Sequence, residues 1–312
     1  MNIVQIKDYE LCDNIAQEII DHPGMISRQE RKLLYALANK YYRGEGCIID
    51  AGTFLGASTV TFYQALKDRK FKVGNNKPIQ SFELAVVRPN FDRHAQKWGL
   101  PRRDIGESYE DILRQQLAHT MDYVELHIGN ILDYDASDID KIEIAFLDIL
   151  KNEQITEHCF HIFLSKLIEG GVIIQQDYFF DDLPFIKYMT EALDDHLEYN
   201  GEVRSSAVFT LRRPLDEKTL NDRISNLNGE DKLKLHSRAE VRTVSRNRQY
   251  LMKLSRARLF ASLGRIEEAR KTWARADMIF EEEVFDKDGN VKNEFVWRHE
   301  RLNKLLERKE KN

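Results

Sequence analysis

Apolar residues in the first two thirds of the chain fall into short runs rich in β-branched and aromatic side chains. These runs alternate with stretches of helical periodicity, which is typical of a parallel sheet with helices on both faces. They predict strands at Cys47–Ala51, Ile79–Glu83, Tyr123–Ile128, Ile142–Asp148, Gly171–Gln176 and Ala207–Leu211. We therefore expect an α/β fold built on a doubly wound, mostly parallel sheet.

Helical patterns flank this region on both sides. Ser27 and Glu30 have the spacing of a capping box, which predicts a helix that covers one side of the sheet's ligand edge. After Arg213 and Pro214 the β pattern stops, and the rest of the chain is helical in period and rich in charge. We predict three parts: a helical cap at 1–46, the sheet domain at 47–213 and a helical extension at 214–312.

Within the extension, one stretch has the small residues of a tightly packed helical pair. It runs from Leu251 to Phe280, with Gly264 at the turn and with Ala257, Ala261, Ala269 and Ala276 spaced for close packing. It resembles one tetratricopeptide-like hairpin. Such repeats need stacked neighbours to bury a core, so a repeat array and a plain helical pair both stay open.

The composition is that of an intracellular globular protein. The 312 residues are 42% hydrophobic, no run approaches the roughly 20 apolar residues of a membrane span, and the first residues lack a secretory pattern. We expect a cytoplasmic location. Cys12, Cys47 and Cys159 are odd in number and far apart, so we expect reduced thiols and neither a disulfide framework nor a zinc site.

Charge divides the chain unevenly. The net charge is -5, yet residues 215–312 carry 23 Lys and Arg against 18 Asp and Glu. Acids are interleaved there, so the pattern favours a solvated helical surface over an acidic partner. The basic group Arg242, Arg246 and Arg248 is open to the same two interpretations. The tryptophans make no stacking platform, so we expect neither a nucleic-acid partner nor a membrane span.

The strongest chemical signal follows the first strand. The run Cys47-Ile-Ile-Asp-Ala-Gly-Thr-Phe-Leu-Gly-Ala-Ser-Thr59 is an apolar strand, a glycine turn and a helix start. Gly52 and Gly56 permit a sharp turn and a close ligand, and a helix start presents free N–H groups to that ligand. The spacing is neither the G-x-G-x-x-G of nicotinamide enzymes nor a triphosphate-binding loop. A purely structural strand–turn–helix is the alternative.

This run resembles motif I of class I S-adenosylmethionine-dependent methyltransferases. The likeness is to the branch of catechol O-methyltransferase, macrocin O-methyltransferase and cephalosporin hydroxylase-like proteins, and it covers about residues 25–213. It implies a Rossmann-like seven-stranded sheet. It also implies that the amino-acid portion of S-adenosylmethionine is held by a set of residues from this turn: Asp50, Gly52, Thr53, Phe54, Gly56, Ser58 and Thr59.

The next two strand ends carry further cofactor candidates. Glu83 ends the second strand, where a carboxylate accepts hydrogen bonds from both ribose hydroxyls. After the third strand, the resemblance implies that Asn130 accepts from the adenine amino group and that Ile131 lies against the adenine ring. An exposed strand-end glutamate and an ordinary turn asparagine are the alternatives.

The fourth and fifth strands end at the acceptor candidates. In metal-dependent relatives the corresponding acids bind a divalent cation, usually Mg2+, which here would be held by Asp148, Gln176 and Asp177. The chain departs from that pattern, because Leu150 and Gln176 stand where macrocin-type enzymes have acids. Without a metal, Asp148 or Asp177 would take the acceptor proton, and Lys151 or Tyr178 would orient the hydroxyl. Acids that merely cap helices are the alternative.

These residues predict an O-methyltransferase that acts on a small hydroxylated acceptor, such as a sugar or glycosylated metabolite. A further likeness, to methyltransferase-like proteins with the same Asp-Ala-Gly-x-Phe-Leu-Gly and Gln-Gln-Asp-Tyr signatures, points to surface-carbohydrate pathways. A second hypothesis is a non-catalytic protein of this fold that binds a partner, or a second copy of itself, through the tail. A hydroxylase is disfavoured, because iron sites commonly use two histidines and a carboxylate. His158 and His161 lie among apolar residues, which favours packing.

Overall fold

The chain forms two compact units in the computed structural model, which describes residues 15–74, 76–89, 91–243, 246–283 and 293–310. The first unit comprises residues 1–176 and 195–217, and the second comprises 177–194 and 218–312. The predicted cap therefore lies partly outside the described residues, and Cys12 lies wholly outside them. The helical unit takes an internal stretch, 177–194, that the sequence analysis assigned to the sheet domain; the predicted division at residue 214 stays a prediction.

The first unit is built on one seven-stranded sheet in the order β3-β2-β1-β4-β5-β7-β6. Its strands are β1 (Cys47–Ala51), β2 (Ile79–Glu83), β3 (Val124–Ile128), β4 (Ile142–Leu147), β5 (Leu167–Gln175), β6 (Leu197–Val203) and β7 (Ser206–Leu211). β1 to β5 are parallel, and β7 is antiparallel to both β5 and β6. The predicted Rossmann-like, mostly parallel sheet is confirmed.

One strand has no counterpart among the predicted runs. β6 is the edge strand of the sheet, and only its two terminal residues, Leu197 and Val203, are buried. The five residues between them include two glutamates, an asparagine and a glycine. An edge strand with this composition lacks the alternating apolar pattern that identifies a half-buried strand.

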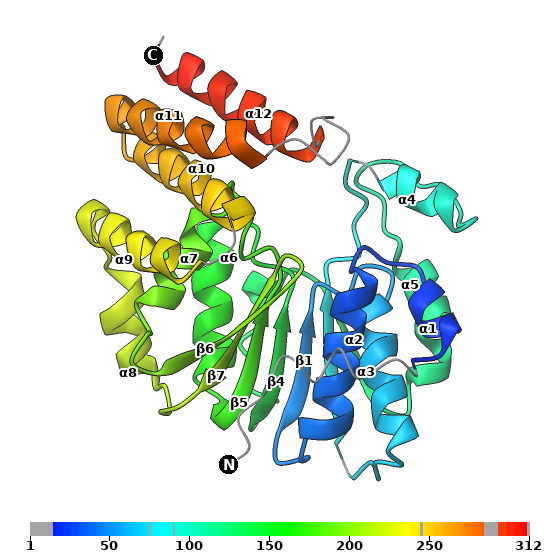
Figure 1. Cartoon of the computed structure of the whole chain (residues 1–312). Helices are drawn as coiled ribbons and strands as arrows, with labels where there is room; N and C mark the ends of the chain where they lie inside the picture. Colours follow the sequence, from blue (N-terminus) through cyan, green and yellow to red (C-terminus); the bar gives the residue numbers. More distant parts are fainter. Residues whose placement is uncertain (1–14, 75, 90, 244–245, 284–292, 311–312) are drawn as a thin grey trace. The chain divides into compact units, whose positions relative to one another are not determined.

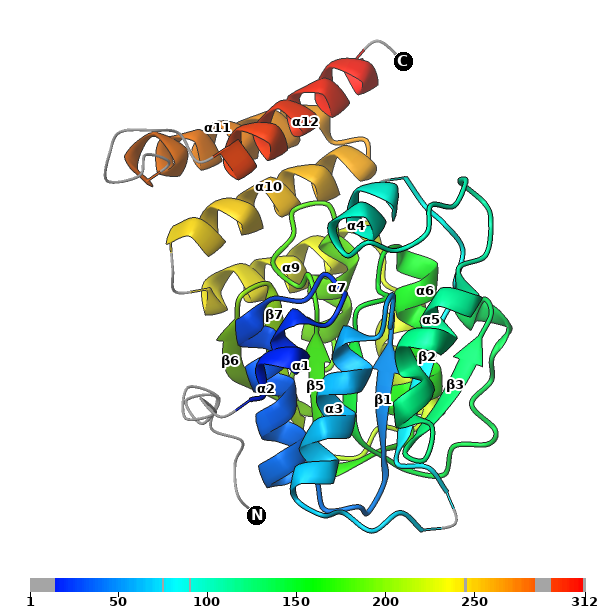
Figure 2. The same ribbon diagram turned by 90° about the vertical axis from the view of Figure 1, so that its right-hand side faces the viewer.

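Helices cover both faces of the sheet. They are α1 (Gln17–Asp21), α2 (Arg28–Ala36), α3 (Ala57–Asp68), α4 (Phe91–Lys97), α5 (Glu110–Leu117) and α6 (Glu153–Cys159), with short helical turns at Leu37–Tyr41, Ala118–Thr120, Ile131–Asp133 and Phe160–Leu164. α2 and α3 lie side by side (Figures 1 and 2) and pack on Ile48, Phe146 and Val172. On the opposite face Phe163 contacts Phe82 at 5.4 Å between ring centroids.

The second unit is helical. It contains α7 (Pro184–Glu191), most of α8 (Glu217–Leu220), a helical turn at Asn221–Ser225, α9 (Gly229–Arg242), α10 (Arg246–Ser262), α11 (Ile266–Glu283) and α12 (Asn293–Glu310). α10 and α11 pack together as a hairpin, and Gly264 adopts a positive φ of 76° between them. None of the described helices is long and apolar enough to cross a membrane.

Candidate cofactor and acceptor site

Hydrogen bonds bring the predicted strand-end residues to one edge of the sheet. The amide of Gly52 donates to the carbonyl of Phe82 at 2.9 Å, and that of Gly129 to Glu83 at 3.0 Å. On the other side of β1, the amide of Asp148 donates to the carbonyl of Ala51 at 2.8 Å, and the amide of Gln176 donates to the carbonyl of Leu147 at 3.1 Å. The ends of β1 to β5 are therefore in register, and ligands of open α/β sheets bind at this carboxyl edge.

Both glycines of the turn are required by the protein itself. Gly52 and Gly56 have φ angles of 97° and 93°. A Cβ atom on Gly52 would lie 2.8 Å from the backbone carbonyl of Asp148, and one on Gly56 would lie 2.7 Å from the side chain of Leu117. The positive φ angles agree with the sharp turn that the sequence predicts at these glycines. The close neighbours in the structure are the residues after β4 and a side chain of α5, and the predicted close ligand stays a prediction.

Asp50 is the most unusual residue of this edge, because its carboxylate is fully buried and only half satisfied. Its Oδ2 atom accepts a hydrogen bond from the hydroxyl of Thr59 at 2.5 Å. Among the described residues, none donates to its Oδ1 atom. Burial raises the pKa of Asp50 to about 6. A buried acceptor without a donor costs about 1–3 kcal/mol, so a ligand that donates there is strongly favoured.

The start of α3 lies directly after this turn. Gly56 is the N-cap residue of this 12-residue helix, and no side chain caps it. Ser58 and Thr59 in the first turn are 2% and 0% exposed. Uncapped N–H groups and the helix dipole favour a carboxylate at this end. An amino acid carries both an ammonium and a carboxylate, which suit Asp50 and the α3 start respectively.

Glu83 connects the turn to strand β2. Its Oε2 accepts from the amide of Phe54 at 2.6 Å, and its Oε1 accepts from the amide of Ala85 at 3.2 Å. The buried Tyr109 also contacts it, and burial, followed by the charge of Glu83, raises the pKa of that phenol. Each carboxylate oxygen accepts more than one hydrogen bond, so Glu83 keeps capacity for ribose hydroxyls. Tyr109 was missed because its contact to Glu83 is not visible in the local sequence.

The two adenine candidates lie on the turn after β3. Asn130 caps the helical turn Ile131–Asp133, and its side-chain oxygen accepts from the amide of Leu132 at 3.2 Å. This capping contact occupies one acceptor site of the oxygen that the sequence analysis assigned to the adenine amino group. Ile131 is buried, with 5% of its surface exposed. Both adenine contacts stay predictions.

Asp148 and Lys151 form an ion pair at the end of β4. The ammonium group of Lys151 donates to Oδ1 of Asp148 at 2.7 Å, and the Asp148 side chain is 18% exposed. Leu150, at the position where relatives have an acid, is buried in the core. Asp148 is thus the one acid of this turn that reaches solvent, with a cation held beside it.

The residues of this edge do not fit the predicted Mg2+ site. The amide oxygen of Gln176 accepts from the hydroxyls of Ser206 at 2.5 Å and Ser205 at 3.3 Å. Both serine hydroxyls also lie within hydrogen-bond distance of the buried Glu30, at 2.9 Å and 3.1 Å from its Oε1, so each shares its one hydrogen between the two acceptors. Gln176 is therefore engaged with the β6–β7 turn, and Asp148 with Lys151. The described part of the chain contains no group of three His, Cys, Asp or Glu that could hold a metal ion.

Asp177 and Tyr178, the other acceptor candidates, belong to the second unit. Asp177 adopts a left-handed φ of 59°, and its carbonyl accepts from the amide of Phe180 at 2.9 Å. Tyr178 is 3% exposed, with the ammonium of Lys187 6.0 Å from its ring centre. The chain therefore turns sharply straight after the sheet and continues into the helical unit.

The N-terminal segment contributes a residue at the glycine turn that the sequence analysis missed. His22 contacts the carbonyl of Leu55 through Nε2 at 3.0 Å, and burial lowers its pKa to about 4. It is therefore neutral at neutral pH. The capping box of Ser27 and Glu30 is confirmed. His158 and His161 contact the Tyr134 carbonyl and Glu217 respectively, both at 2.9 Å.

No protein-family model and no curated protein matches the sequence. Solved structures do resemble the chain. The O-methyltransferase NovP shares 12% identity and a TM-score of 0.49 over 64% of this chain and 89% of its own. An O-methyltransferase from Bacillus cereus in complex with SAH shares 18% identity and a TM-score of 0.42, over 67% of this chain and 90% of its own. CalS11, a calicheamicin methyltransferase, shares 13% identity and a TM-score of 0.43, over 66% of this chain and 89% of its own.

All three likenesses are at low sequence identity. The fold of this chain rests on its own strand order, with β7 inserted antiparallel beside β5. That order gives the Rossmann-like, seven-stranded sheet that the resemblance of the glycine turn to class I methyltransferases implies.

Proposed function

We propose that this chain is an S-adenosylmethionine-dependent methyltransferase that methylates a hydroxyl group of a small acceptor, such as a sugar or glycosylated metabolite. The observation that carries the proposal is the buried carboxylate of Asp50, whose Oδ1 lacks a donor among the described residues. It lies at the foot of the glycine turn, before the uncapped start of α3. A cationic amino group is the ligand chemistry that such an atom favours.

In this proposal each part of the cofactor has its own residues. Asp50 binds the ammonium, and the first turn of α3, with Ser58 and Thr59, binds the carboxylate. Glu83 binds the ribose hydroxyls through the acceptor sites that Phe54 and Ala85 leave open. Ile131 lies against the adenine ring. The buried position of these groups strengthens each polar contact, because water competes less there.

The bound cofactor supplies an electrophilic methyl group on a sulfonium sulfur. Asp148 or Asp177 accepts the proton of the acceptor hydroxyl, and Lys151 or Tyr178 orients that hydroxyl. Lys151 donates to Oδ1 of Asp148 at 2.7 Å, so its charge lies beside one of the two candidate bases. Most of the rate then comes from aligning the acceptor oxygen with the methyl group. Because Gln176 accepts from the serines of the β6–β7 turn and Asp148 pairs with Lys151, this mechanism assigns no step to Mg2+.

Calorimetric titration with S-adenosylmethionine and S-adenosylhomocysteine tests the cofactor assignment. We expect the wild-type protein to bind with micromolar affinity, about -8 kcal/mol. In Asp50→Asn the affinity should fall at least about tenfold, because charge-assisted hydrogen bonds contribute about 1.5–3 kcal/mol. Asp68→Asn is the matched control, since Asp68 lies on the exposed side of α3 and bonds Gln64. Wild-type protein that binds neither compound would refute the proposal.

A second function is a protein of this fold that binds a partner without catalysis. A buried leucine at position 150 and a glutamine at position 176 favour it, because neither residue supplies the acid that the metal-dependent family has there. The variant that carries both Asp148→Asn and Asp177→Asn separates the two functions. If the protein is a catalyst, this variant loses turnover with an acceptor and keeps cofactor binding. If the protein only binds a partner, the variant keeps the function that this binding performs in the cell.

A further inference from the structure

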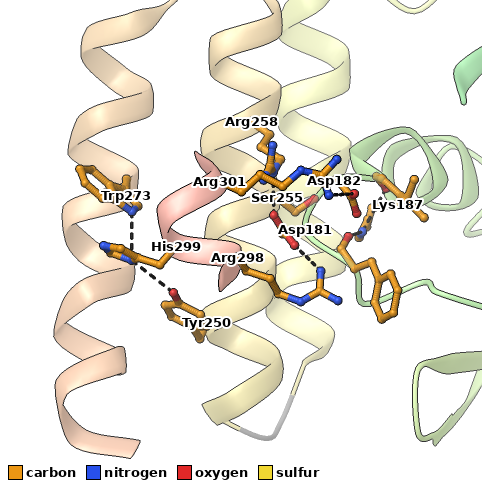
Figure 3. Close-up of polar contacts among 12 residues, drawn as sticks. Asp181, Asp182, Lys187, Tyr250, Ser255, Arg258, Trp273, Arg298, His299 and Arg301 are labelled. Atoms are coloured by element: carbon orange, nitrogen blue, oxygen red, sulfur yellow. Dashed lines mark hydrogen bonds and ion pairs between the residues drawn. The ribbon is translucent and has the colours of Figure 1, made fainter. Parts of the chain in front are cut away.

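The five residues that follow Asp177 form a segment whose members are all contacted by cations. This cation-held segment comprises Tyr178, Phe179, Phe180, Asp181 and Asp182. The cations come from three helices of the same unit: Lys187 from α7, Arg248 and Arg258 from α10, and Arg298 and Arg301 from α12. Figure 3 shows the two aspartates with Lys187, Arg258, Arg298 and Arg301.

Asp181 is the centre of this arrangement. It is 1% exposed, its Oδ2 accepts from Nε of Arg258 at 2.6 Å, and its Oδ1 accepts from Nη1 of Arg298 at 2.5 Å. Burial alone would raise the pKa of Asp181, but the attraction and hydrogen bonds of the two arginines outweigh it and lower the pKa. One carboxylate therefore joins α10 to α12 in its ionised form (Figure 3).

The neighbouring residues are held by their rings and carbonyls. The guanidinium of Arg298 lies 4.2 Å from the ring centre of Phe180, and that of Arg248 lies 4.5 Å from the ring of Phe179. The fully buried ammonium of Lys187 donates to the carbonyls of Phe180 and Leu183. One backbone carbonyl of the segment, that of Phe180, is thus held as well as its side chains.

Such an arrangement exceeds what packing requires. Buried ion pairs contribute little to stability compared with apolar residues of similar volume, because burial removes the charges from water. In some proteins such pairs are kept because they select one arrangement of the groups they join. Asp177, with its left-handed φ of 59°, and Tyr178 lie four and three residues before Asp181 in the sequence. Both are acceptor-side candidates of the proposed function.

We propose that Arg258 and Arg298 are positioning residues, which act through Asp181 to hold Asp177 and Tyr178 in the conformation used for the acceptor. The inference rests on the proposed function. It makes the C-terminal helices part of the catalytic machinery through the segment that they hold. It also explains why residues 177–194 belong to the helical unit.

Hydrogen–deuterium exchange of the full-length protein tests the structural half without any ligand. Asp181→Asn leaves both arginines without their shared carboxylate, so peptides covering 177–183 should exchange about tenfold faster or more. Peptides from β1 and α3 should exchange as in the wild type. Asp194→Asn is the matched control, because Asp194 pairs with Arg238 while 32% of its side chain is exposed. Unchanged exchange in Asp181→Asn overturns the inference. If that variant fails to fold, Arg258→Lys, which keeps the charge, takes its place.

Kinetics test the catalytic half, with monosaccharides, nucleoside diphosphate sugars and glycosylated phenols as acceptors and S-adenosylhomocysteine release as the readout. Asp181→Asn should lower kcat about 100-fold and change the Kd of S-adenosylhomocysteine by less than about twofold. Arg258→Lys should restore part of the rate relative to Arg258→Ala. Faster exchange with unchanged kcat overturns the positioning role. Wild-type protein that binds no cofactor refutes the proposed function instead. In that case the exchange experiment still tests whether Asp181 fixes the conformation of residues 177–183.

Discussion

At the scale of single residues, the acids of the proposed cofactor site are held by the protein in advance of a ligand. Thr59 donates to Asp50, and the amides of Phe54 and Ala85 donate to Glu83. Side chains fixed in this way lose little entropy when a ligand binds. The cost is concentrated at Asp50, whose burial raises its pKa to about 6.

Cofactor binding should therefore depend on pH through Asp50. Its pKa in the folded protein, about 6, is above the ordinary value of 3.8, so the free protein holds a proton there below about pH 6. A ligand ammonium favours the ionised carboxylate, and binding must then release this proton. We expect the Kd of S-adenosylhomocysteine to be about tenfold weaker at pH 5 than at pH 7.5. Calorimetry at both values measures this, and an equal Kd would contradict it.

Gly52→Ala should destabilise the protein instead of only blocking a ligand. Its Cβ would meet the backbone of Asp148 at 2.8 Å, and its φ is 97°. We expect the free energy of unfolding to fall by about 2–4 kcal/mol. Gly99→Ala isolates the steric part, because Gly99 has a φ of 65° and its Cβ would have no atom within 4 Å. Equal losses in the two variants, measured by urea denaturation, would refute the steric explanation.

At the scale of elements, the sequence predicts what local patterns encode. The ends of β1 and β2 are predicted at the observed residues, because each apolar run stops at a turn and parallel strands share one edge. β6 was missed because its residues are polar at the sheet's edge. The partners of Gln176 were missed because Ser206 lies 30 residues further on, and Glu30 bonds that serine across 176 residues. No local pattern encodes such contacts.

The start of α2 offers a test of this long-range network. Ser27→Ala removes only the N-cap, whose hydroxyl accepts from the amide of Glu30 at 3.2 Å. It should cost about 1 kcal/mol. Glu30→Ala should cost more, about 2–3 kcal/mol, because Ser206 in the core also loses its carboxylate partner. Thermal unfolding of both variants gives the comparison, and an equal loss would show that Glu30 acts only as a cap.

At the scale of the whole molecule, the second unit carries buried charge throughout. Lys187 is fully buried, and burial lowers its pKa to about 7. Glu191, one turn later on α7, has its pKa raised to about 7, again by burial, and lies 3.1 Å from Arg242. The stability of this unit should therefore respond to pH close to neutrality.

Lys187 gives that response a definite sign. Between about pH 7 and its ordinary pKa of 10.5, the unfolded chain holds a proton that the folded protein does not, so stability rises with pH. The expected slope is about 1 kcal/mol per pH unit. A neutral amine still donates to both carbonyls. Lys187→Met should lose this rise when the free energy of unfolding is compared at pH 7 and 9. The same slope in both proteins would contradict the assignment.

The bond between Asp181 and Arg298 spans 117 residues, which sets an order of events during synthesis. Domains begin to fold on the ribosome from the N-terminal side, at about 5–20 residues per second. The sheet strands through β5 emerge well before α12, so a nascent chain holds Asp181 with only part of its counter-charge. A chain that ends before Arg298 keeps every residue assigned to the cofactor and lacks half of the Asp181 pair. On the proposed positioning role, loss of the C-terminus, by a nonsense mutation or by proteolysis, would thus leave a cofactor-binding protein with strongly reduced turnover.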